Sequence, residues 1–89
     1  MRRTAAGENA RLTHIQLVRM RGRYIVVHDD IPRNRWIAYR IAGIAFGPTP
    51  DEAAAQTFAD GGQPAEAFPS LAEAAAYARM TQHMESDRT

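Results

Sequence analysis

The stretch Phe46-Gly-Pro-Thr-Pro-Asp-Glu-Ala-Ala-Ala and its near copy Phe68-Pro-Ser-Leu-Ala-Glu-Ala-Ala-Ala decide the fold that the sequence predicts. In each copy a hydroxyl residue stands three positions ahead of a glutamate, and an alanine run follows. This spacing is the capping box: the hydroxyl accepts from the backbone N–H of the glutamate, and the carboxylate reaches back to the cap's own N–H. We therefore expect two helices, with N-caps at Thr49 and Ser70.

The ends of both helices are predicted from their flanks. Asp60-Gly61-Gly62 ends the first helix near Phe58, because glycine readily takes the left-handed conformation found after helix ends. The second helix runs to about Met84. It carries a stripe of mostly small residues that lets a helix lie close to a sheet, namely Leu71, Ala74, Ala75 and Ala78. The repeated phrase is a start signal used twice, since repeat folds need at least three units.

Extended segments precede the first helix. Tyr24-Ile-Val-Val is rich in β-branched and aromatic residues. A second such run extends from Trp36 to Ile41 and continues weakly to Phe46 across a bulge or bend at Gly43. Residues 11–20 suit either a strand or a short helix, and the link Arg21-Gly22-Arg23 favours a hairpin.

Two further segments connect these elements. Residues 29–34 form a turn, because Pro32 interrupts a strand ladder and Asn34 tolerates left-handed backbone. Residues 63–68 form a connector or a short edge strand. The predicted architecture is α+β, in the order β-β-β-α-(β)-α. A three-stranded or four-stranded antiparallel sheet is packed by two helices.

We expect both helices on one face of this sheet, which leaves the other face in water or in an interface. In the third strand, residues 37, 39 and 41 would then face the helices. Because side chains alternate along a strand, Trp36, Ala38 and Arg40 would point to the open face.

The chain of 89 residues makes one domain. We predict a flexible N-terminal tail over residues 1–10, a domain over 11–84 and a C-terminal tail over 85–89. The absence of cysteine excludes disulfides and thiol chemistry and favours a cytoplasmic protein. No apolar run approaches the roughly 20 residues that span a bilayer, so no membrane association is expected. The small size leaves self-association as a homodimer open.

Charge divides the chain near Phe46. Residues 1–45 carry nine arginines against three acids, whereas residues 46–89 carry two arginines against seven acids. Such an asymmetry indicates a polarised surface and a charged partner. Otherwise the two halves neutralise each other within the fold or in a head-to-tail dimer.

Catalytic and metal-binding chemistry has little support in the sequence. The three histidines, His14, His28 and His83, lack metal-ligand spacing, so no metal and no cofactor is expected. A two-residue hairpin turn pairs His28 with Ile15, and a three-residue turn pairs it with Gln16. Neither register gives His14 and His28 a shared target. An enzyme, such as a small hydrolase or nuclease, is the least favoured function.

Arginines interleaved with aromatic residues are the strongest functional candidate. Guanidinium groups bind carboxylates and phosphates, and aromatic rings anchor protein interfaces or stack on bases. The residues predicted to bind a partner are Arg21, Arg23, Arg33, Arg35, Trp36 and Arg40. Trp36 is the expected anchor. The alternative is that Trp36 belongs to the core and the arginines are ordinary solvated strand residues.

These residues favour a non-enzymatic module that binds a protein partner and occludes part of its surface. Nucleic-acid binding on the same sheet face is the alternative. The net charge of +1 argues against strong duplex binding, which depends on many phosphate contacts.

Three segments together resemble the HicB-like antitoxin domain: Tyr24-Ile-Val-Val, Trp36-Ile-Ala-Tyr and Gly47-Pro-Thr-Pro-Asp-Glu-Ala. The resemblance covers residues 24–58. It implies a β-β-β-α module that binds a protein partner, often as a dimer. The chain lacks the family's proline-containing loop after the second strand. In size and lack of catalytic groups it also looks like small phage-encoded inhibitors of the anti-CRISPR type, without a shared motif.

Overall fold

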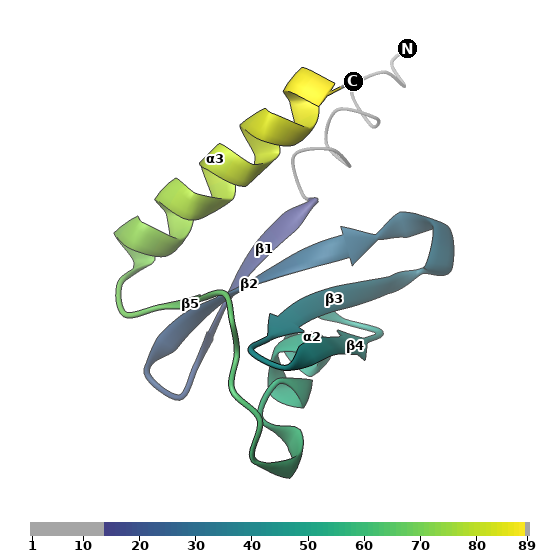
Figure 1. The fold of residues 1–89 in the computed structure, drawn as a ribbon, viewed down its shortest axis with the longest axis vertical. Helices are drawn as coiled ribbons and strands as arrows, with labels where there is room; N and C mark the ends of the chain where they lie inside the picture. The colour runs from purple at the N-terminus through teal and green to yellow at the C-terminus, as the bar shows by residue number, and fades with distance from the viewer. Residues whose placement is uncertain (1–13, 89) are drawn as a thin grey trace.

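The computed structural model describes residues 14–88, with side chains described as far as Thr81. Four consecutive antiparallel strands lie side by side in chain order: β1 (Ile15–Met20), β2 (Arg23–Asp30), β3 (Arg35–Arg40) and β4 (Gly43–Gly47). Helix α2 (Pro50–Gln56), the short strand β5 (Ala67–Phe68) and helix α3 (Leu71–Arg88) follow (Figure 1). The α+β class and the antiparallel sheet are confirmed. The sheet has five strands, one more than the larger predicted count.

The first hairpin closes through a two-residue turn. Ile15 pairs with His28 and Met20 with Arg23, which confirms the first of the two predicted registers. Arg21 and Gly22 both have positive φ, 54° and 77°, as a tight hairpin turn requires. Residues 15–20 are therefore strand and not helix. The predicted tail over residues 1–10 lies outside the described residues.

The third predicted strand is in fact two strands. Ile41 and Ala42 form a tight turn, after which Arg40 pairs with Gly43 and Trp36 with Gly47. Gly43 has φ +112°, a conformation that side-chain-bearing residues rarely adopt, and this explains the glycine that interrupts the run. The turn before β3 is shorter than the predicted 29–34, because Asp29 and Asp30 pair with β3 as the end of β2. A single 3-10 turn, Ile31–Arg33, ends at Asn34 with φ 53°, the left-handed conformation expected there.

Both helix starts are confirmed. The backbone N–H of Glu52 donates to Thr49 Oγ1 and that of Glu73 to Ser70 Oγ, each at 3.2 Å. In the second box the Ser70 hydroxyl donates in turn to the Glu73 carboxylate. α2 ends at Gln56, two residues before the predicted end, and a 3-10 turn follows. α3 continues to Arg88, beyond the predicted helix end at about Met84 and into the segment 85–89 that was predicted as a C-terminal tail.

Residues 63–68 enter the sheet where β2 and β3 move apart. The first half of this segment bonds to β3, since Ala65 N donates to Tyr39 O at 2.7 Å and Ile41 N donates to Gln63 O at 3.0 Å. The second half bonds to β2, where Val26 N donates to Glu66 O at 2.9 Å and Phe68 pairs with Tyr24. The segment predicted as a connector or edge strand therefore lies inside the sheet and bends at Ala65 and Glu66. We call residues 63–68 the wedge.

The two helices lie on opposite faces of the sheet, which corrects the prediction that both cover one face (Figure 1). α2 packs on a core of small and β-branched side chains: Val18, Ile25, Val27, Ala38, Ala45, Ala53 and Ala54. α3 contacts β1, β2 and β5 from the other side, where the Tyr77 and Phe68 ring centroids lie 5.2 Å apart. Of the predicted alanine stripe, Ala74 is fully buried, whereas Leu71 is exposed.

The close approach of α2 to the sheet depends on Gly47. A Cβ at this position would overlap the backbone of Glu52 and Ala53 at the start of α2. Ala53 and Ala54 are fully buried, so the helix has no space to move inward elsewhere. Glycine is thus required here for lack of volume, because its φ is not positive.

We predict that Gly47→Ala lowers the free energy of unfolding by about 2 kcal/mol, as overpacking in a dense core does. Chemical denaturation followed by circular dichroism measures the change. Gly62→Ala is the matched control, because the atoms nearest to its added Cβ belong to the Arg40 guanidinium, a side-chain end that can shift more easily than backbone. Equal effects at the two glycines would contradict this packing argument.

Candidate functional site

Part of the sheet face that α3 covers is left open. α3 lies over β1, β2 and β5, whereas β3 and β4 extend beyond it (Figure 1). On these two strands Tyr39, Ile44 and Phe46 are 37%, 50% and 41% exposed, and Ile37 is half-buried. We call these four residues the open-face patch.

Strand register brings the patch together. Ile37 pairs with Phe46 and Tyr39 with Ile44, so that the four side chains form two adjacent rows on one face. Because the side-chain period of a strand is two, the residues between them point to α2. Directly opposed side chains on one face have Cβ atoms about 4.5–5.5 Å apart, which makes the patch contiguous.

An arginine borders the patch on one side. The Arg35 guanidinium lies 3.9 Å from the ring centroid of Phe46, a cation–π distance. Its Nε also donates to Asp30 Oδ2 at 2.9 Å, and the more exposed Arg33 donates to Asp30 Oδ1 at 3.4 Å. Asp30 thus holds both guanidiniums at this end of the sheet, close to the aromatic surface.

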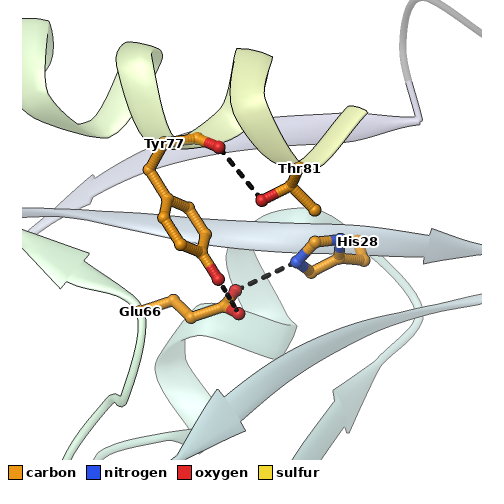
Figure 2. Close-up of polar contacts among 4 residues, drawn as sticks. All are labelled: His28, Glu66, Tyr77 and Thr81. Atoms are coloured by element: carbon orange, nitrogen blue, oxygen red, sulfur yellow. Dashed lines mark hydrogen bonds and ion pairs between the residues drawn. The ribbon is translucent and has the colours of Figure 1, made fainter. Parts of the chain in front are cut away.

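A polar cluster of His28, Glu66 and Tyr77 borders the patch on the other side. Figure 2 shows the Glu66 carboxylate between the other two side chains. His28 Nε2 lies 2.9 Å from Glu66 Oε1, and the Tyr77 hydroxyl donates to Glu66 Oε2 at 2.8 Å. Because a carboxylate only accepts, Nε2 carries the proton. The His28 ring also meets Tyr39 of the patch edge-on, with centroids 5.5 Å apart.

The polar cluster is largely shielded from solvent, and this burial affects the pKa of Tyr77. The His28 and Glu66 side chains are only 11% and 16% exposed. Burial and the hydrogen bond to Glu66 raise the pKa of Tyr77 above its ordinary value of 10.0, because both favour the neutral phenol. The cluster joins the wedge and α3, which are neighbours in sequence, to β2, where His28 lies 38 positions before Glu66.

The geometry of the cluster indicates a structural clamp. Glu66 links His28 on β2 to Tyr77 on α3, and the His28 ring contacts the edge of the Tyr39 ring. Among the side chains that the structure describes, residues 14–81, no three His, Asp or Glu converge as metal ligands would. The helices in this part of the chain include none that is long and apolar enough to cross a membrane.

The structure separates the predicted partner-binding residues. Arg33 and Arg35 share Asp30 at one end of the sheet. Arg21 and Arg23 lie at the other end, about 23 Å away for seven residues of strand. There Arg21 stacks 4.3 Å from the Phe58 ring centroid, and both arginines line an open groove with Gly22, Pro64, Ala67, Phe68 and Pro69.

Trp36 and Arg40 lie on the α2 side, which corrects the predicted orientation of β3. Ala38 between them is fully buried in the core beneath α2, and alternation places Trp36 and Arg40 on that face. Trp36 is half-buried and packs against this core. Arg40 donates to the Ala59 carbonyl at 3.2 Å. Neither residue contributes to the open-face patch.

Sequence reasoning missed the patch because it placed the strand with the wrong face outward. The signal was present in the alternation of Gly43-Ile-Ala-Phe-Gly47, in which large apolar residues alternate with small ones. Glu66 gave no comparable signal, because the connector that carries it has no periodicity.

Comparison of the chain with models of known protein families, with curated proteins and with solved structures gives no significant match. The resemblance to the HicB-like antitoxin domain therefore stays a prediction.

We predict that the Tyr77 phenol ionises with a pKa above its ordinary value of 10.0, and that Tyr77→Phe removes this titration step. The folded state holds this proton more tightly than the unfolded chain does. Its contribution to stability is therefore present below pH 10.0 and is lost as pH rises through the folded pKa. Phenolate absorbance and alkaline unfolding measure both effects. Tyr24→Phe is the control, and removal of the same titration step by both variants would refute the assignment.

Proposed function

We propose that this chain is a small non-enzymatic protein-binding module, an inhibitor or antitoxin-like accessory protein that occludes a surface of its partner. The single observation that carries the proposal is the open-face patch. Contiguous exposed apolar surface is uncommon on a domain that works alone, and it typically serves binding.

The composition of the patch supports a protein partner. Tyr39 and Phe46 are aromatic, and Arg35 lies against the Phe46 ring. Aromatic residues and arginine are enriched at the centres of protein interfaces, where they contribute most of the binding free energy. Polar clusters flank the patch on both sides. This arrangement matches protein interfaces, which have an apolar core and a polar rim.

The charge of the sheet supports an acidic partner. Of the six arginines in residues 15–47, Arg33 and Arg35 lie at the patch end of the sheet, where both pair with Asp30. Arg33, the most exposed of the pair at Asp30, lies beside the patch with its side chain 65% exposed. Complementary charge at an interface rim speeds association and excludes partners of the wrong sign. The proposed partner surface is therefore apolar at its centre and acidic at its margin.

The use of the polar side chains supports a role without catalysis. Thr49 and Ser70 are engaged as helix caps. His28 and Tyr77 both bond to Glu66, which fixes α3 and the wedge on the sheet. These groups have structural partners that account for them.

Single-stranded nucleic acid is the rival ligand, favoured by one observation. Tyr39 and Phe46 are exposed rings on an open sheet face beside an arginine, as in surfaces that stack bases. A gel shift with single-stranded oligonucleotides at low and high salt separates the two functions, because phosphate contacts make binding strongly salt-dependent. A shift that salt abolishes and that Phe46→Ala weakens would replace the protein-binding proposal.

We predict that Phe46→Ala weakens partner binding by more than about 1 kcal/mol and leaves cooperative unfolding intact, as expected of an exposed interface anchor. Trp36→Ala should instead lower the free energy of unfolding by about 2–3 kcal/mol, because it leaves a cavity against the core. Affinity capture from a lysate of the source cells, followed by titration with the captured protein, measures the first effect. Thermal and chemical unfolding measure the second.

The control for binding is Leu71→Ala, which removes an apolar side chain that is 54% exposed and lies outside the patch. It should retain the partner that Phe46→Ala loses. Retention by all variants would exclude the open-face patch as the binding surface. Loss of the partner with Trp36→Ala at unchanged stability would restore Trp36 as the anchor.

A further inference from the structure

Among the described residues, no strand pairs with the outer edge of β4, which leaves backbone groups unpaired there. β4 pairs with β3 and is the last strand in the sheet order. On the far side of β3, Tyr39 O accepts from Ala65 and Ile41 N donates to Gln63. Alternate residues of an antiparallel strand bond to opposite neighbours, so residues 36, 38 and 40 bond to β4.

This pairing pattern shows which backbone N–H and C=O groups of β4 have no partner in the sheet. The β4 residues opposite 36, 38 and 40 are Gly47, Ala45 and Gly43, which therefore bond inward. Ile44 and Phe46 lie between them, and their N–H and C=O groups point outward from the sheet. The edge thus presents two donors and two acceptors within a segment of three residues.

Devices that usually protect a sheet edge are missing from this segment. Gly43-Ile-Ala-Phe-Gly47 contains no charged residue and no proline, whereas the edge strand β1 carries the exposed Arg19. Natural edges avoid pairing with other chains through charges, prolines, bulges and short strands. Only the last of these applies to β4, and Pro48 directly after it limits the available length.

The strand is also complementary to itself. The segment Gly43-Ile-Ala-Phe-Gly47 is symmetric in side-chain size about Ala45: small and large residues alternate in the same order from either end. Antiparallel pairing with a second copy would place Ile44 opposite Phe46 of that copy, and glycine opposite glycine at both ends. Each Ile44–Phe46 pair would exchange two hydrogen bonds, so that all four free groups of each strand are satisfied. No charge faces a like charge across the axis.

We propose that two copies of this chain associate through antiparallel pairing of their β4 strands, about a two-fold axis at Ala45. The pairing makes one continuous sheet of the two protomers. It also places the two open-face patches side by side, since Ile44 and Phe46 carry their side chains on that face. Because five residues a strand make a small interface, the dimer is weak and concentration-dependent. The inference concerns purified protein alone and does not depend on the proposed partner.

Sedimentation velocity over a micromolar concentration series tests the dimer. Wild-type protein should shift from monomer to dimer as concentration rises. Ile44→Lys should raise the dissociation constant by about tenfold or more, because symmetry removes two apolar cross-strand pairs and adds two edge lysines. Ile41→Lys is the matched control: it places the same charge in the neighbouring turn, outside the paired segment, and should leave the dissociation constant unchanged.

Cross-linking tests the register, and the natural absence of cysteine makes it specific. Ile44→Cys and Phe46→Cys should form a disulfide-linked dimer when mixed under oxidising conditions, and far less when either is oxidised alone. Efficient cross-linking between two copies of the same variant would overturn the two-fold axis at Ala45. A wild-type monomer at every concentration, or a dimer that Ile44→Lys does not weaken, would overturn the proposal itself.

Discussion

The insertion of residues 63–68 between β2 and β3 is the constraint on which the rest of the structure depends. Strands of a twisted sheet that move apart expose backbone N–H and C=O groups, which are costly to leave unpaired in a domain interior. The wedge satisfies those groups on both strands, from Tyr39 and Ile41 on one side and Val26 on the other. Its bend places the Glu66 carboxylate beneath α3, where His28 and Tyr77 both bond to it. The position of α3 follows from these contacts.

This position of α3 explains why the sheet is covered unequally. Since α2 already packs on one face through Ala53 and Ala54, the chain must carry its second helix to the other face. On that face the wedge places α3 over β1 and β2, so that β3 and β4 extend beyond the helix. The open-face patch is what remains uncovered, and its two borders are ordered by Asp30 and by Glu66. The uncovered strands therefore keep exposed apolar side chains, among them Ile44 and Phe46.

Particular residues show how far the sequence could be interpreted. Thr49 and Ser70 were predictable because a capping box is a local interaction between residues three apart. For residues 11–20 the sequence left strand and short helix open, and it left the turn at two or three residues. The place of Trp36 was also open, because alternation shows which residues share a face but not which face a helix covers. Trp36 was expected at the surface with the core as the alternative. The structure has it half-buried against the core, while Tyr39 is 37% exposed on the opposite face.

The sequence by itself determined the two helix starts, the α+β class and the lack of thiol chemistry, all of which depend on composition or on neighbours a few residues apart. Tertiary structure alone decided that the helices lie on opposite faces, that residues 63–68 pair inside the sheet, and that Ile37, Tyr39, Ile44 and Phe46 form one surface. The physical reason is the distance along the chain. Glu66 bonds to a histidine 38 positions earlier, and no local pattern records a contact of that range.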